Sequence, residues 1–91
     1  MTEYFDGDWK VNPQLGRVHE YDGDWDAVHA TAHGYVKMSA DKYTHGAYTH
    51  LEFIWQGRLY RRTYNVFYGP RYAARLASRF AAEIALQAVP A

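Results

Sequence analysis

The clearest alternation of apolar and polar side chains lies in the second half of the chain. Two β-rich runs, 47–55 and 58–67, flank the pair Gln56-Gly57. Such runs around a glycine-containing pair predict a β-hairpin with a two-residue turn. The predicted opposite pairs on one face are Trp55 and Arg58, Phe53 and Tyr60, Leu51 and Arg62, Thr49 and Tyr64, and Ala47 and Val66, while Glu52 opposes Arg61 on the other face. Because the first face carries the aromatic residues, we expect it to be the core.

A helical pattern follows this hairpin. Gly69-Pro70 interrupts the chain, and proline suits the first position of a helix. The region 70–88 is rich in alanine and leucine, and its apolar residues recur at helical spacing, which predicts an amphipathic helix. The stripe is Ala73, Leu76, Ala77, Phe80, Ala81 and Ile84. We expect a core in which Leu51, Phe53, Trp55, Tyr60 and Val66 pack against Leu76, Phe80 and Ile84.

The N-terminal region contains a near repeat of an acidic, aromatic motif. Phe5-Asp6-Gly7-Asp8-Trp9 recurs sixteen positions later as Tyr21-Asp22-Gly23-Asp24-Trp25. Asp-Gly between aromatic residues is a strong turn signal, so a short hairpin is predicted at each copy.

Two periodicities compete after Trp25. Apolar and small residues at the even positions from Val28 to Met38 alternate with polar ones, which favours one half-buried strand. Asp24 is also suited to cap a short helix over 25–33 that Gly34 would end. The longer alternation favours the strand, and a turn is predicted at 39–42.

Together these patterns predict an α+β fold, an antiparallel β-sheet of three to five strands packed against one C-terminal α-helix. We expect a single domain over 1–91 with acidic Asp-Gly hairpins at 1–27, the antiparallel sheet at 28–68 and the helix at 70–88.

Composition limits the chemistry. The chain has no cysteine, which excludes disulfides and thiolate sites. Five histidines, including His29 and His33, lack the spacing of a zinc motif, and no nucleophile or phosphate-binding motif is present. We therefore expect no metal, no cofactor and no enzymatic activity. No segment is apolar enough to span a membrane and the first residues do not resemble a signal peptide, so we expect a cytoplasmic protein with no membrane partner.

Charge and aromatic content point to binding. The formal net charge is zero, but acids dominate up to Asp41 and bases dominate afterwards. Nine tyrosines and three tryptophans are too many for so small a core, and exposed aromatic residues are typical of recognition surfaces. The first hypothesis is a protein-binding module that docks on a basic, nucleic-acid-handling surface. Its predicted contact residues are Asp6, Asp8, Trp9, Tyr21, Asp22, Asp24, Trp25 and Asp26. In size and composition such a protein resembles the inhibitors that phages and other mobile elements encode against host defence proteins.

The alternative hypothesis is a nucleic-acid-binding domain. It would use Arg58, Arg61, Arg62, Arg71, Arg75 and Arg79. The order of strand, hairpin and helix resembles the arm-binding domains of integrases and the C-terminal part of double-stranded RNA-binding domains. Gly69-Pro70-Arg71 stands where the second family has a lysine pair, and the zero net charge argues against strong phosphate binding. The arginines on the helix are equally able to neutralise the acidic half of the same molecule. The oligomeric state is left open.

Overall fold

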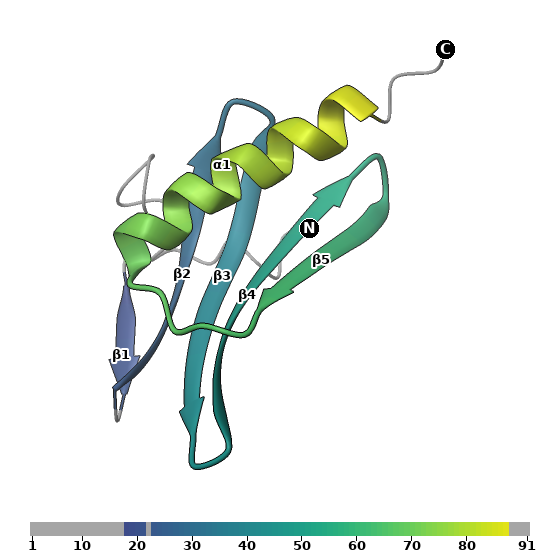
Figure 1. The fold of residues 1–91 in the computed structure, drawn as a ribbon. Helices are drawn as coiled ribbons and strands as arrows, with labels where there is room; N and C mark the ends of the chain where they lie inside the picture. The colour runs from purple at the N-terminus through teal and green to yellow at the C-terminus, as the bar shows by residue number, and fades with distance from the viewer. Residues whose placement is uncertain (1–17, 22, 88–91) are drawn as a thin grey trace.

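The computed structural model describes residues 18–21 and 23–87. The elements are β1 (His19–Tyr21), β2 (Asp24–Thr31), β3 (Gly34–Tyr43), β4 (Gly46–Trp55), β5 (Arg58–Tyr64) and α1 (Pro70–Gln87). Each strand pairs antiparallel with the next, so the five strands form one meander in chain order (Figure 1). The α+β prediction, an antiparallel sheet with one C-terminal helix, is confirmed.

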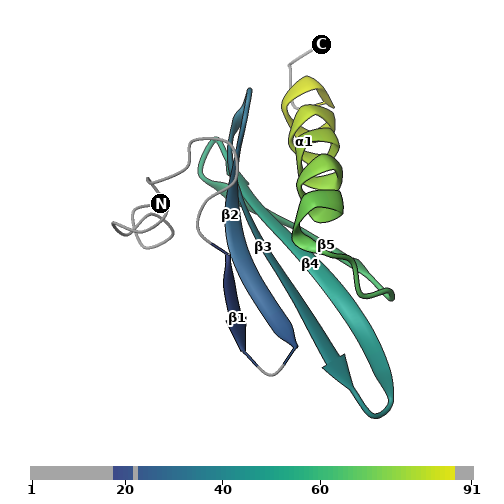
Figure 2. The same cartoon turned by 90° about the vertical axis from the view of Figure 1, so that its left-hand side faces the viewer.

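Helix α1 forms a second layer against one face of the sheet (Figure 2). It packs on β2, β3 and β4. Gly69 accepts the first helical hydrogen bond from Ala73 N at 3.0 Å, and Pro70 occupies the first turn as predicted. No helix of the described chain is long and apolar enough to cross a membrane.

The β4–β5 hairpin has the predicted register. Trp55 opposes Arg58, Phe53 opposes Tyr60 and Thr49 opposes Tyr64. Gln56 and Gly57 both have positive φ angles, 51° and 76°, as a two-residue turn of this twist requires. The register ends at Tyr64, so the predicted pairing of Ala47 with Val66 does not occur.

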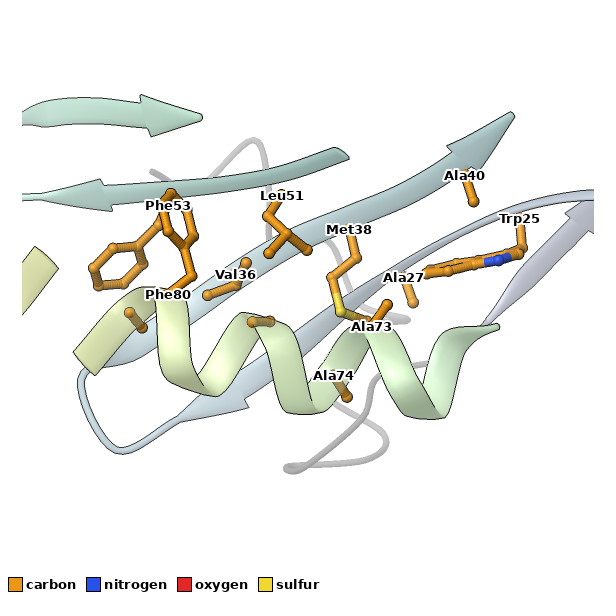
Figure 3. Packing of buried hydrophobic residues seen from close by; sticks show 12 residues of the cluster. Trp25, Ala27, Val36, Met38, Ala40, Leu51, Phe53, Ala73, Ala74 and Phe80 are labelled. Carbon is orange, nitrogen blue, oxygen red and sulfur yellow. The ribbon is translucent and has the colours of Figure 1, made fainter. Parts of the chain in front are cut away.

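The core lies between α1 and the sheet (Figure 3). Phe53 and Phe80 meet with ring centroids 6.5 Å apart in an edge-to-face arrangement. The remaining buried cluster residues are Trp25, Ala27, Val36, Met38, Ala40, Leu51, Ala73, Ala74, Ala77 and Ala81. Trp55, Tyr60, Leu76 and Ile84 pack at its margin. Val66, predicted to be in the core, is 47% exposed because the chain has left β5 before reaching it.

The region 24–43 differs most from the prediction. Residues 25–31 form a strand and not a helix, as the longer alternation favours. The predicted single strand is wrong, because the chain turns back at Ala32-His33. The turn predicted at 39–42 is also wrong, because β3 continues through it to Tyr43. Thr31 stabilises the actual turn, since its hydroxyl donates to Gly34 O at 2.6 Å and accepts from His33 N at 3.1 Å. The sheet also begins earlier than residue 28, because β1 and β2 already belong to it. Gly23, with φ of 83°, lies in the β1–β2 turn that the second Asp-Gly motif predicts.

Candidate recognition face

The face of the sheet opposite α1 gathers most of the charged strand residues. We call it the open face, since no other helix or strand of the described chain packs on it, although Val28 on its β2 part is only 2% exposed. Strand alternation and register place on it Asp24, Asp26, Val28 and Ala30 of β2, Tyr35, Lys37, Ser39, Asp41 and Tyr43 of β3, Tyr48, His50, Glu52 and Ile54 of β4, and Leu59, Arg61 and Thr63 of β5.

The centre of the open face is a hydrogen-bonded charge cluster. Lys37 opposes Glu52, which in turn opposes Arg61. Arg61 donates from Nε to Glu52 Oε2 at 3.0 Å, and its Nη2 lies 2.6 Å from the same oxygen. The predicted Glu52–Arg61 cross-strand pair is therefore confirmed, and the charge of Arg61 is compensated within the fold.

His50 lies between a hydroxyl and a carboxylate. Its Nδ1 is 3.0 Å from Thr63 Oγ1, and its Nε2 is 3.5 Å from Asp41 Oδ2. This order of groups is shared with nucleophilic triads, but the hollow beside it, of about 320 Å³, is lined by Lys37, Ser39, Asp41, His50, Glu52 and Arg61. Since all of these are polar, the hollow lacks the dry, low-dielectric walls that strengthen catalytic electrostatics. Asp41, His50 and Thr63 connect β3, β4 and β5 across the open face.

An aromatic ladder occupies the β3–β4 hairpin end of the open face. We define it as the rings of His45, Tyr43, Tyr48 and His50. Successive ring centroids are 5.5 Å, 6.1 Å and 6.3 Å apart. Tyr43 is 54% exposed. The ladder therefore presents aromatic surface on the strand face that also carries Asp24 and Asp41.

The carboxylates of Asp41 and Asp24 raise the pKa of Tyr43. The negative charge of Asp41 is the largest cause that raises the pKa of Tyr43 above its ordinary value, followed by burial and then by the charge of Asp24. Asp24 Oδ1 also accepts a hydrogen bond from Lys42 N at 2.9 Å, which fixes this carboxylate at the β2–β3 seam. The Lys42 side chain points elsewhere, since its Nζ lies 4.3 Å from the centroid of the Phe67 ring. The ladder end of the open face is thus electronegative.

This pKa shift leads to a prediction. Asp41→Asn is expected to lower the pKa of Tyr43 toward the ordinary tyrosine value, because the amide no longer opposes the negative charge of the phenolate. Tyrosine-selective NMR across an alkaline pH series measures the change. Glu83→Gln, which removes a carboxylate in the helix layer, is the control and should leave the pKa of Tyr43 unchanged. An Asp41→Asn protein whose Tyr43 titrates like the wild type would contradict the placement of these two groups.

The structure divides the predicted acidic contact residues. Asp24 and Asp26 lie on the open face, and Asp41 joins them from β3. Asp6, Asp8, Trp9 and Asp22 lie outside the described residues, and the side chain of Tyr21 is not described either.

Trp25, a predicted contact residue, is instead part of the core. It is 3% exposed, it faces α1, and its Nε1 donates to Tyr68 O at 2.9 Å. A side chain held in the core in this way cannot be a partner contact. The aromatic side chains beside Asp24 and Asp41 on the open face are instead Tyr43 and Tyr48. Sequence reasoning missed them because the turn predicted at 39–42 interrupts the alternation of Asp41, Tyr43, Tyr48 and His50 on one face.

The predicted arginines fall into two groups. Arg62 donates from Nη2 to Glu83 Oε2 at 2.8 Å and lies 4.9 Å from the Phe80 ring centroid. The guanidinium of Arg62 lowers the pKa of Glu83 through this hydrogen bond and its charge. Arg62 and Arg61 are therefore internal partners. Exposed Arg71, Arg75 and Arg79 stand at four-residue intervals on α1, and none forms an ion pair with a carboxylate of the described chain; Arg58 is exposed at the start of β5.

The histidines do not form a metal centre in the part of the chain that the structure describes, where no group of three or more metal-ligating side chains occurs. His29 and His33 contact different parts of the fold. The turn separates them, because His29 Nε2 lies 2.9 Å from Ser78 Oγ of α1 while His33 packs edge-on against Trp55.

Comparison with known proteins identifies no relative. No protein-family model matches the chain, and neither a curated protein nor a solved structure shows significant similarity to it.

Proposed function

We propose that this protein is a small non-enzymatic binding module that uses the open face to cover a basic surface of a protein partner. The observation that carries the proposal is the convergence of the aromatic ladder, with its exposed Tyr43 and His45, and Asp24, Asp26 and Asp41 on the sheet face opposite α1. Tyrosine contributes large contact area at low entropic cost, and carboxylates steer a basic partner into place.

The size of the open face supports this proposal. Strands about 4.8 Å apart that rise about 3.3 Å per residue give the four longer strands a face of roughly 600 Å². One side of a standard protein interface is about 800 Å². The part of the open face around Val28 is buried, so the accessible area lies mainly on β3, β4 and β5 and their rim. A basic surface that normally handles nucleic acid has the complementary charge. Covering such a surface would inhibit its owner, which is the mode of action we propose for an inhibitor of a host defence protein.

The test compares two charge variants against the purified partner. The partner is first isolated with the wild-type protein and identified. The triple variant Asp24→Asn, Asp26→Asn, Asp41→Asn keeps side-chain size and the acceptor that Lys42 N needs, yet it removes three charges. It should weaken binding by about tenfold or more and reduce the dependence of the affinity on salt. The matched control Arg71→Gln, Arg75→Gln, Arg79→Gln should bind like the wild type. Undiminished binding by the acidic triple variant would refute the proposal.

A nucleic-acid-binding function is the second candidate, and one observation favours it. Arg71, Arg75 and Arg79 lie in one exposed row on α1 next to Tyr72, which is itself exposed. If this row binds phosphates, each arginine removed should lower the salt slope of duplex binding by about 0.9. A gel shift with DNA and RNA duplexes at two salt concentrations measures this binding and its dependence on salt. Tight duplex binding by the wild type that the arginine triple variant loses would favour this function over the first.

A further inference from the structure

We propose that the aromatic ladder, with Asp24 and Asp41 beside it, is a receptor for arginine side chains of the protein partner. This inference rests on the proposed function and specifies what the ladder end of the open face recognises. The orientation of the rings, the position of the carboxylates and the direction of the Lys42 side chain support it.

The rings form two stacked pairs that meet at an angle. Tyr43 and His45 are 11° from parallel, and Tyr48 and His50 are 19° from parallel, whereas Tyr43 and Tyr48 are tilted by 50°. Exposed Tyr43 and His45 therefore offer flat ring surface to the solvent. A planar guanidinium stacks on such a surface, which the compact and strongly hydrated ammonium of lysine does less well.

Gly46 permits this arrangement. A Cβ atom on Gly46 would lie 2.9 Å from the Tyr48 hydroxyl, so any larger residue must displace the end of the Tyr48 ring. The hydroxyl end of the Tyr48 ring therefore lies over Gly46, where a side chain would collide with it. Gly46→Ala thus offers a way to disturb the ladder without removing a charged group.

The carboxylates supply the second half of guanidinium recognition. Asp41 contacts His50 through Oδ2, and Asp24 uses Oδ1 for Lys42 N. A carboxylate has about four acceptor positions, so both retain capacity for the parallel N–H donors of a guanidinium. An arginine that stacks on Tyr43 lies within the field of both groups.

Lys42, Arg61 and Lys37 are the basic side chains near the ladder or the hollow beside it. Lys42 precedes Tyr43, but its ammonium lies over Phe67 on the helix side. Arg61 is bound to Glu52. Lys37 lines the same hollow as Asp41 and His50. We therefore expect an incoming arginine on the side of Asp24 and Tyr43, from which the Lys42 ammonium is turned away.

The experiment uses short peptides and the whole protein. One peptide carries arginines, a second has lysine at every arginine position, and a third has uncharged citrulline there. We expect the arginine peptide to bind most tightly, and chemical-shift changes to concentrate on the Tyr43 and Tyr48 rings. Tyr43→Leu should reduce the affinity for the arginine peptide about two- to fivefold, as loss of an exposed cation–π contact does. It should also reduce the ratio of the affinities for the arginine and lysine peptides. Gly46→Ala should shift the NMR signals of the Tyr48 ring and also reduce the ratio of the affinities for the arginine and lysine peptides.

Tyr72→Leu is the matched control, because Tyr72 is also an exposed tyrosine but lies on α1. It should leave peptide binding unchanged. Equal binding of the arginine and lysine peptides, or the absence of shift changes at Tyr43, would overturn the arginine receptor. The proposed function fails separately, when the partner binds the triple aspartate variant as tightly as the wild type. A partner that loses affinity for the aspartate variant but not for Tyr43→Leu would refute only the present inference.

Discussion

Phe80→Ala is expected to lower the free energy of unfolding by about 3–5 kcal/mol, as truncation of a large buried aromatic residue does. Phe80 is 2% exposed and lies between α1 and the sheet, edge-on to Phe53 (Figure 3). The substitution would leave a cavity at the centre of the only described layer contact and would also remove the ring beneath Arg62. Urea unfolding followed by circular dichroism measures the loss.

Two exposed residues supply the controls for Phe80. Leu86 is 69% exposed on α1, and Val66 lies outside the core. Leu86→Ala and Val66→Ala should each change stability by no more than about 0.5 kcal/mol, which is the usual range for surface substitutions. A loss below about 1 kcal/mol for Phe80→Ala would show that α1 does not pack on the sheet through this ring.

The sequence predicts the β4–β5 hairpin and α1 well because both carry strong local signals. Gln56-Gly57 suits a turn with two positive φ angles, and Gly69-Pro70 marks the start of the helix. The apolar stripe of α1 is right in outline, but its most deeply buried members are mainly alanines. Alanine lets the helix approach the sheet closely, so Leu76 and Ile84 lie at the margin of the core instead of at its centre.

The β2–β3 turn is the feature that sequence reasoning could not locate. Neither Ala32 nor His33 is a residue type that favours turns. The alternation of apolar and polar positions also continues through them without a break. After a two-residue turn, odd-numbered residues of the first strand share a face with even-numbered residues of the second. Ala27 on β2 and Met38 on β3 therefore face α1 together, whereas Val28 faces the other side.

Alternation within β2 explains why Trp25 lies in the core and not beside the two aspartates. Trp25 shares a strand with Asp24 and Asp26, which made it resemble part of one acidic, aromatic surface. Alternation along β2 instead sends Trp25 to the core and the two aspartates to the open face. The grouping of Asp24 with Tyr43 and Tyr48 depends on β2, β3 and β4 coming together, so no single segment of the sequence displays it.

Thr49→Val is expected to destabilise the protein by about 2–4 kcal/mol although valine has nearly the same shape as threonine. Thr49 is fully buried, its hydroxyl donates to Val66 O at 2.7 Å, and the same oxygen accepts from Tyr68 N at 3.0 Å. Valine would leave both backbone groups without these partners. Because Trp25 binds Tyr68 O, the segment between β5 and α1 is held by two side chains from the sheet, and its release should loosen the N-terminal end of α1.

Thr49→Ser distinguishes this hydrogen-bonding role from packing. Serine keeps the hydroxyl and loses one methyl group, which should cost about 1 kcal/mol. The valine variant should therefore be the less stable of the two, even though valine is the more apolar residue. Urea unfolding gives the order of stabilities, and hydrogen exchange should show faster exchange of the Tyr68 amide in Thr49→Val than in Thr49→Ser. The reverse order would mean that Thr49 contributes through its methyl group, and that the connection to α1 is held chiefly by Trp25.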